Sequence, residues 1–304
     1  MLHEGIKGLL AIVIASLLWG TTGVTASYTT DLSPLAIGAF TMGVGGVWLS
    51  LAARKSLVRD YSKLRLHPKL VFFGALCVVI YPLAFYSSMF FAGVAIGTMV
   101  SIASAPLFAA ILERLFSKKP ISTQWFISFL FGALGIMFLA LGKAPINAST
   151  ESSKFMHVIG VALGLVAGLA YAGYSWVAKQ LIDLGANSKS AIAIQFACAA
   201  LFLLPSLWFT GENLFTNQIN ISIVFYMATV PMFFGYLLFS YGLRTISASN
   251  ATLITLIEPL FATLLAILIV GEKFLSIGWF GMALICFCLL VQSINVHAIR
   301  QQFS

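Results

Sequence analysis

Charged side chains are scarce in this chain. Only 9% of its 304 residues are charged, whereas 60% are hydrophobic. Soluble domains carry about 25% charged residues, so this chain has too few to cover a surface that faces water. The shortage excludes a soluble globular protein and predicts a polytopic α-helical protein whose solvent is lipid.

Reactive and metal-binding residues are also few. The cysteines at positions 77, 198, 286 and 288 all lie within apolar runs, no CxxC pair occurs, and the histidines do not cluster. We interpret the cysteines as packing residues and expect no metal or other cofactor. The sequence has no GxxxxGK[ST] loop, no HExxH and no GxSxG. These absences argue against ATP-driven transport and against an intramembrane enzyme.

Long apolar runs fill almost the whole chain. A membrane-spanning helix needs about 20 mostly apolar residues. Runs of this length predict ten spans, over residues 7–27, 34–53, 70–90, 94–113, 121–142, 158–178, 190–209, 221–242, 250–270 and 277–296. The runs are continuous rather than alternating, which disfavours a β-barrel.

The two halves of the chain resemble each other. Residues 104–112 read SAPLFAAIL and residues 257–265 read IEPLFATLL, an offset of 153, and residues 8–23 align with 160–175 at an offset of 152. Each half holds five predicted spans, and an odd number forces the second half to enter the membrane in the opposite direction. We predict two inverted five-helix repeats, at 1–142 and 158–304, joined by an outer loop at 143–157.

Basic residues predict the orientation. With the N-terminus inside, fourteen basic residues fall on the cytoplasmic side and three (Lys143, Lys154 and Lys273) on the outer side. This bias predicts that both termini are cytoplasmic in an inner membrane protein. The net charge of +8 therefore indicates orientation rather than binding of nucleic acid. The basic segment 54–69 is most simply an orientation signal, and contact with anionic membrane lipids is a second interpretation.

Inverted repeats favour transport over other membrane functions. A site between two such halves can face one side of the membrane and then the other, which is the alternating access of secondary transporters. A channel needs rings of carbonyl or charged groups, and one chain with a single intramembrane carboxylate offers none. A membrane scaffold without transport activity explains neither the inversion nor the prolines within the spans.

Several segments resemble one known family. Residues 17–23 (LLWGTTG), 32–40 (LSPLAIGAF) and 241–285, which include EPLFA and GE, are similar to EamA-type transporters of the drug/metabolite transporter superfamily. The resemblance implies ten helices, cytoplasmic termini and a central cavity between the halves. The first half departs from the pattern, with SAP in place of EP and Lys119 where the repeat aligns Glu272. The family's Glu-Pro element is therefore carried over only to Glu258 and Pro259.

Glu258 is the central candidate for a substrate-binding residue. It lies about eight residues into the ninth span, roughly 12 Å deep at 1.5 Å per residue. A carboxylate there is costly unless it is paired, protonated or wetted. It could exchange a proton, in which case protons are the coupling ion, or bind an ammonium group of the substrate. The structural alternative is that it braces the helix beside Pro259.

Mid-span aromatic and polar residues are further candidates for the cavity wall. An aromatic side chain away from the membrane interface needs a partner for its polar end, which a wet cavity or a neighbouring helix supplies. The aromatic candidates are Trp19, Tyr81, Tyr171, Tyr86, Tyr174 and Tyr236. The polar candidates are Ser101, Ser104 and Gln195, for which hydrogen bonds between helices are the alternative.

Small and helix-breaking residues indicate how the helices move and pack. Prolines within spans loosen a helix and favour bends where gates close, and packing is the alternative. The predicted gating residues are Pro82, Pro106, Pro231 and Pro259, and Pro205 also lies within a span. Gly160, Gly164, Gly168 and Ala172 form a small-residue stripe for close helix contact.

The sequence therefore predicts a secondary transporter for a small-molecule substrate. The family resemblance favours export of amino acids or related compounds. Efflux of organic cations or drugs is an alternative, because aromatic rings and Glu258 suit a cation. Antiport of sugar phosphates or nucleotide sugars is disfavoured, because no basic residue lies centrally in a span.

Overall fold

The computed structural model describes residues 2–142, 151–271 and 275–301. Throughout these ranges the regular secondary structure is helical. Nine helical segments of the described chain are long and apolar enough to cross a membrane, and the tenth has a shorter apolar part, Ser276–Gln292. The predicted all-α membrane fold is confirmed.

Each half of the chain contributes five spans, in the order that the sequence predicts. The first half consists of α1 (Leu2–Ala26), α2 (Pro34–Arg65), α3 (Pro68–Ala92), α4 (Val94–Phe116) and α5 (Thr123–Leu141). The second half opens with α6 (Glu151–Asp183) and α7 (Ser188–Thr210). Its eighth and ninth spans are interrupted. They consist of α8 (Gln218–Met227), the π-helical η1 (Ala228–Phe234), α9 (Gly235–Gly242), α10 (Ala248–Ile254), α11 (Ile257–Leu265) and π-helical η2 (Ala266–Val270), and α12 (Ser276–Gln301) follows.

Two helices, α2 and α6, extend furthest beyond their predicted spans. α2 continues to Arg65, although the sequence placed the end of its span at residue 53. The basic residues there do not break a helix, and the chain turns at His67, where the following Pro68 disfavours helical geometry. α6 begins at Glu151 rather than at 158, so part of the expected outer loop is helical. Residues 143–150, which include Lys143, lie outside the described residues.

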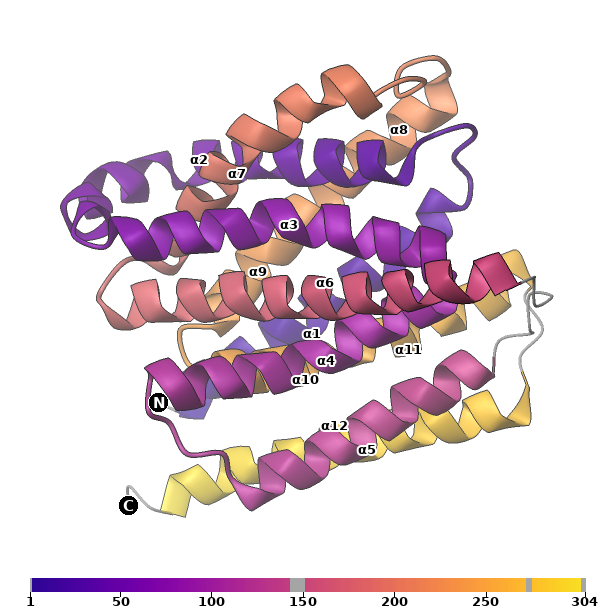
Figure 1. The fold of residues 1–304 in the computed structure, drawn as a ribbon. Coiled ribbons are helices and arrows are strands. Elements are labelled where there is room, and N and C mark those ends of the chain that lie inside the picture. The colour runs from indigo at the N-terminus through magenta and orange to yellow at the C-terminus, as the bar shows by residue number, and fades with distance from the viewer. Residues whose placement is uncertain (1, 143–150, 272–274, 302–304) are drawn as a thin grey trace.

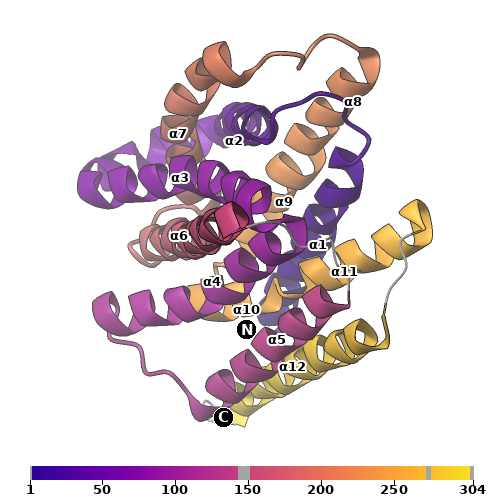
Figure 2. The same cartoon turned by 45° about the vertical axis from the view of Figure 1, so that its right-hand side comes forward.

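Helices of one half pack against helices of the other. α6 of the second half lies along α3 and α4 of the first, and α1 of the first half contacts α9 and α11 of the second. Figure 2 shows α1 between α9 and α11. α2 pairs with its repeat mate α7, and α5 pairs with its repeat mate α12, at opposite edges of the bundle in Figure 1. The contacts of each half are thus matched in the other, as two inverted repeats require.

The small-residue stripe of α6 is the surface on which α3 and α4 pack. A methyl group added at Gly160 would lie 2.5 Å from the backbone nitrogen of Ala92, and one at Gly168 would lie 2.7 Å from the carbonyl oxygen of Ser101. Larger side chains would push these helices apart, because real contacts of this kind are longer. The prediction of close helix contact along this stripe is confirmed.

Candidate functional site

The ninth span is broken where the sequence placed its carboxylate. α10 ends at Ile254, Thr255 and Leu256 leave the helical pattern, and α11 begins at Ile257. Pro259 has no N–H to donate to the Thr255 carbonyl, which instead accepts from the backbone N–H of Glu258 at 2.9 Å. A discontinuous membrane helix exposes backbone groups at mid-depth, where transporters bind their ligands.

Glu258 lies half-buried at this break. Among the described residues, its carboxylate has no hydrogen-bond or ion-pair partner. It interacts electrostatically with four tyrosine hydroxyl groups, those of Tyr81, Tyr86, Tyr171 and Tyr236. The first two belong to α3 and the others to α6 and α9, so tyrosines of both halves lie within electrostatic range of this carboxylate.

Close packing of α1 fixes the position of α11. A methyl group added at Gly20 would lie 3.0 Å from the Glu258 carbonyl oxygen and 3.0 Å from the Phe261 ring. The absence of a side chain at Gly20 therefore lets the backbone of the first span touch the break in the ninth.

The eighth span is interrupted at Pro231, inside the π-helical segment η1. A π-helical turn leaves a carbonyl without its usual helical donor, and such turns are frequent at functional sites. The indole N–H of Trp19 donates to the Pro231 carbonyl at 2.8 Å. Trp19 is 5% exposed, and its ring lies 5.0 Å from that of Tyr236 and 6.3 Å from that of Tyr171. A side chain of the first half thus completes an irregular helix of the second.

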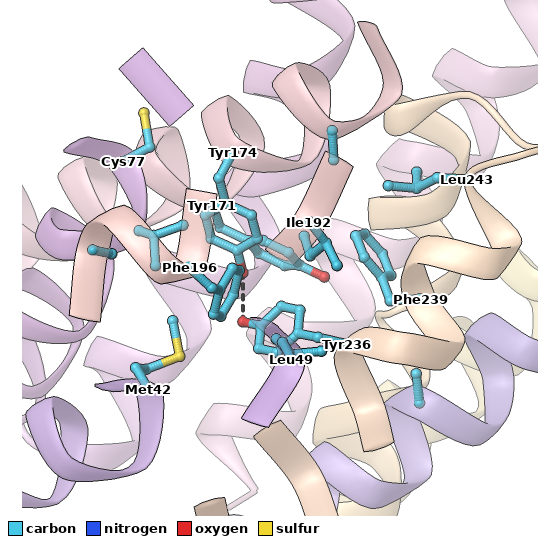
Figure 3. Packing of buried hydrophobic residues seen from close by; sticks show 14 of the residues in the cluster. Met42, Leu49, Cys77, Tyr171, Tyr174, Ile192, Phe196, Tyr236, Phe239 and Leu243 are labelled. Carbon is cyan, nitrogen blue, oxygen red and sulfur yellow. Dashed lines mark hydrogen bonds between the residues drawn. The ribbon is translucent and has the colours of Figure 1, made fainter. Parts of the chain in front are cut away.

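Tyr171, Tyr174 and Tyr236 are buried in the same cluster, which Figure 3 shows from close by. The Tyr174 and Tyr236 hydroxyl groups share a hydrogen bond of 2.8 Å, drawn in Figure 3 as a dashed line. The Tyr171 hydroxyl donates to the Thr255 hydroxyl at 3.1 Å, so it contacts the break in the ninth span. In this conformation the hydroxyl groups of these tyrosines form hydrogen bonds with other side chains of the protein.

Tyr81 and Tyr86 are less buried than the cluster. The Tyr81 ring lies 5.7 Å from the Tyr171 ring and 5.8 Å from the Tyr174 ring, at the edge of the cluster. Tyr86 packs over Gly38 of α2, where an added methyl group would lie 2.7 Å from the tyrosine ring. Both side chains are partly exposed.

The three polar candidates bond within their own helices. The Ser101 hydroxyl donates to the Gly97 carbonyl and the Ser104 hydroxyl to the Ser101 carbonyl. The Gln195 amide donates to the Ala191 carbonyl, and its oxygen is buried without a partner among the described residues. The alternative expectation, hydrogen bonds between helices, is wrong for these donors, because each reaches a carbonyl in the preceding turn of its own helix.

The predicted gating prolines fall into two groups. Pro231 and Pro259 lie at the irregular segments of the eighth and ninth spans. Pro82 and Pro106 lie within α3 and α4, which continue through them. Neighbouring helices hold the latter pair in place, so a proline alone does not mark where a span breaks.

Two buried carboxylates were missed from the sequence. Glu113, near the end of α4, is 4% exposed and accepts hydrogen bonds from the backbone N–H of Ala248 at 3.0 Å and from the Ser249 hydroxyl. Asp60, near the end of α2, is 2% exposed and accepts from the Asn187 N–H and the Ser190 hydroxyl, both at 2.8 Å. Each caps the start of a helix in the other half, a role that sequence separation hides.

Fold and site together define a polytopic membrane protein of two inverted repeats. The second repeat contains a broken helix that carries an intramembrane carboxylate. The chain belongs to the EamA-like transporter family, whose model matches residues 6–141 and again residues 158–294. It is thus a transporter of the EamA and drug/metabolite transporter type, and members of this family are not enzymes.

Two relatives and a solved structure match this chain over nearly its whole length. An uncharacterized transporter YwfM of Bacillus subtilis is 32% identical over 291 residues, which cover 93% of each chain. An uncharacterized inner membrane transporter YicL of Salmonella typhimurium is 22% identical over 296 residues, covering 95% of this chain and 96% of that protein. A crystal structure that is 18% identical matches 96% of this chain and 98% of its own with a TM-score of 0.78, which supports the fold.

Proposed function

We propose that this protein is a secondary active transporter that exports amino acids or related small polar metabolites across the cytoplasmic membrane by alternating access. The observation that carries the proposal is the position of Glu258. It lies at the break of the ninth span, without a partner in the described part of the chain, and within electrostatic range of tyrosines from both halves. An unpaired carboxylate at membrane depth is a functional residue by default.

The surroundings of Glu258 suit a substrate that carries an ammonium group. A carboxylate forms strong charge-assisted hydrogen bonds with such a group, and aromatic faces attract it further. Trp19, Tyr81 and Tyr171 lie between the halves, so we place them on the substrate path when the halves separate. A phosphate-bearing substrate fits poorly. In the described chain Lys179 is the one buried basic side chain, and it pairs with Asp183 at 2.8 Å.

The two ends of the bundle differ in a way that supports alternating access. At the predicted cytoplasmic end, Glu113 joins α4 to the start of α10. At the outer end, the residue that matches Glu113 at the repeat offset of 153 is Ala266, which carries no carboxylate. The first turn of α4 lies at this outer end and follows Gly93 without a side-chain cap. Within the described chain α4 packs extensively on α10 and at most weakly on α11. We infer that this conformation is closed at the cytoplasmic end of the bundle.

Efflux of organic cations is the second candidate function. The carboxylate and the aromatic cluster that suit an ammonium group also suit a larger, apolar cation. Protons are the proposed coupling ion in either case, since Glu258 is the acidic side chain within electrostatic range of tyrosines from both halves.

Counterflow in proteoliposomes tests the proposal. The purified protein is reconstituted into vesicles loaded with an unlabelled amino acid mixture, and uptake of labelled amino acids is measured. Parallel vesicles carry a lipophilic cation or a sugar phosphate. We expect accumulation of one or more amino acids. Counterflow of the lipophilic cation alone would favour the second candidate, and no flux of any solute would overturn the assignment as a metabolite transporter.

A further inference from the structure

A groove of about 780 Å³ opens on the periphery of the helix bundle, between α2, α3 and α7. Its walls are apolar side chains, among them Val58 of α2, Phe72 and Leu76 of α3, and Phe202 of α7. Arg65, Tyr61 and Cys198 are its polar members. The groove lies outside the bundle and shares no residue with the site around Glu258.

The groove has the length of one half of a membrane. Along α3 its lining extends from Pro68 to Val79, which is roughly 16 Å at 1.5 Å per residue. The hydrocarbon core of a bilayer is about 30 Å thick, so one leaflet contributes about 15 Å. The end at Pro68 lies beside the turn between α2 and α3, which the distribution of basic residues places on the cytoplasmic side. The groove therefore begins at the cytoplasmic end of α3 and runs inward along it over a length close to that of one leaflet.

Positive charge surrounds the surface end of the groove. Arg65 lines it directly, and the exposed basic side chains of Lys63 and Lys69 flank the turn between α2 and α3 at this end. The acidic residue near the end of α2, Asp60, is 2% exposed and caps α7, so it presents little negative charge to the surface. A phosphate group at this end would meet a strongly basic surface.

We propose that the groove is a binding site for an anionic phospholipid of the cytoplasmic leaflet. Its acyl chain lies against the apolar walls and its phosphate accepts hydrogen bonds from the Arg65 guanidinium. A basic side chain near a membrane surface favours an anionic lipid by about five-fold in binding. The extension of α2 beyond its predicted span builds one wall of the site, since Leu57, Tyr61 and Leu64 all come from it.

Two native cysteines provide an internal comparison for the test. Cys198 lines the groove and is half-buried, whereas Cys286 of α12 is exposed elsewhere on the apolar surface, and the other two are buried. The detergent-solubilised protein is treated with N-ethylmaleimide, and the alkylation of each cysteine is followed by mass spectrometry. Phosphatidylglycerol or phosphatidylcholine is added in separate samples. We expect phosphatidylglycerol to slow alkylation of Cys198, relative to Cys286, about five-fold more than phosphatidylcholine does.

Matched variants identify the headgroup contact. Arg65→Gln removes the charge at the groove and is expected to abolish the preference for phosphatidylglycerol. Lys55→Gln removes the same charge from an exposed position of α2 that does not line the groove, and is expected to preserve it. Glycerol phosphate without acyl chains should give no protection. The proposal is overturned if both lipids protect both cysteines equally, if Arg65→Gln keeps the preference, or if glycerol phosphate protects Cys198 as well.

Discussion

Each half of the chain carries an acidic residue at a position where the other half has alanine. Glu258 aligns with Ala105, and Glu113 aligns with Ala266, at the repeat offset of 153. The alanines are buried, at 0% and 8% exposure. The duplication thus preserves the helices while the chemistry differs between the halves, because the scaffold needs symmetry and a substrate site does not.

Glu258→Gln separates the possible roles of this residue. Glutamine keeps the shape but cannot release a proton and carries no charge. If Glu258 carries a proton, the variant loses accumulation driven by a pH gradient and retains exchange at equal pH. If it binds an ammonium group, both activities fall and binding weakens by about 1.5–3 kcal/mol. We expect one of these losses in proteoliposome flux assays.

The control for this substitution is Glu212→Gln, which removes an exposed carboxylate from the connection before α8. It should leave both activities unchanged. Flux and pH response equal to those of the wild type in Glu258→Gln would leave only the bracing of the Pro259 break and would remove Glu258 from the mechanism.

Trp19, a candidate for the cavity wall, is buried, so we expect it to contribute to stability. It fills a cluster between the halves and donates to the Pro231 carbonyl, so Trp19→Ala should cost about 3–5 kcal/mol of unfolding free energy. Trp19→Phe keeps most of the packing and should cost about 0.5–1.5 kcal/mol for the lost hydrogen bond. Denaturation of the protein in detergent micelles measures both values.

Trp208 offers the matched control, because it is 91% exposed on the lipid-facing surface. Trp208→Ala should change the unfolding free energy little. Equal stability of Trp19→Ala and Trp208→Ala would contradict the packing observed around Trp19.

Among the described residues, the π-helical segments and the broken span lie in the second half. The eighth span passes through η1 and the ninth through a break and η2, whereas the corresponding α3 and α4 of the first half are continuous. A broken helix can change its direction at lower cost than a continuous one, since fewer hydrogen bonds hold its parts together. The ninth span is therefore the element in which we expect movement during transport.

Glu113 is expected to hold that element in place at the cytoplasmic end. Spin labels at Arg114 of α4 and Arg244, before α10, report the separation of the two helix ends, since both side chains are exposed. Glu113→Ala removes the cap of α10 and should add a population with a longer distance between the labels. Pulsed electron paramagnetic resonance measures the distance distribution.

Asp60→Ala is the matched control for Glu113→Ala. It also deletes a buried capping carboxylate between the halves, but α2 and α7 remain closely packed at Gly43 and Gly46. We therefore expect lower stability without a new distance population between α4 and α10. An unchanged distribution in Glu113→Ala, or the same change in both variants, would refute a latch specific to Glu113.

At the scale of the whole molecule, the two halves are interlocked rather than placed side by side. α1 packs with helices of the second half, and α6 with helices of the first. Motion between the halves must therefore separate groups of helices that each contain members of both. With the alternating access proposed above, the tyrosines near Glu258 would lie between the moving parts.

The orientation of the whole chain remains a prediction, and cysteine labelling tests it. With both termini in the cytoplasm, Lys63→Cys should resist an impermeant thiol reagent added to intact cells, and Asn147→Cys should react. The expectation follows from the excess of basic residues on one side. Labelling after membrane disruption controls for access to Lys63→Cys, and the reverse pattern in intact cells would overturn the assignment.

Much of the fold could be predicted from the sequence, and the candidate site only in part. The ten spans follow from apolar runs, because each membrane helix satisfies its own backbone and must be about 20 residues long. The extended end of α2 was missed because basic residues continue a helix as readily as they end a span. The choice of Glu258 as a candidate residue follows from its depth in the predicted span, but the sequence could not show which tyrosines lie near it.

The sequence by itself determined the membrane class, the number and order of the spans, the duplication and the isolation of one carboxylate in an apolar segment. These properties depend on local composition and on spacing along the chain. Only the tertiary structure decided that Trp19 completes the eighth span, that Tyr171 contacts the break in the ninth, and that Glu113 caps α10. Such contacts join residues 84 to 212 positions apart, and their partners are chosen by helix packing, which no local pattern encodes.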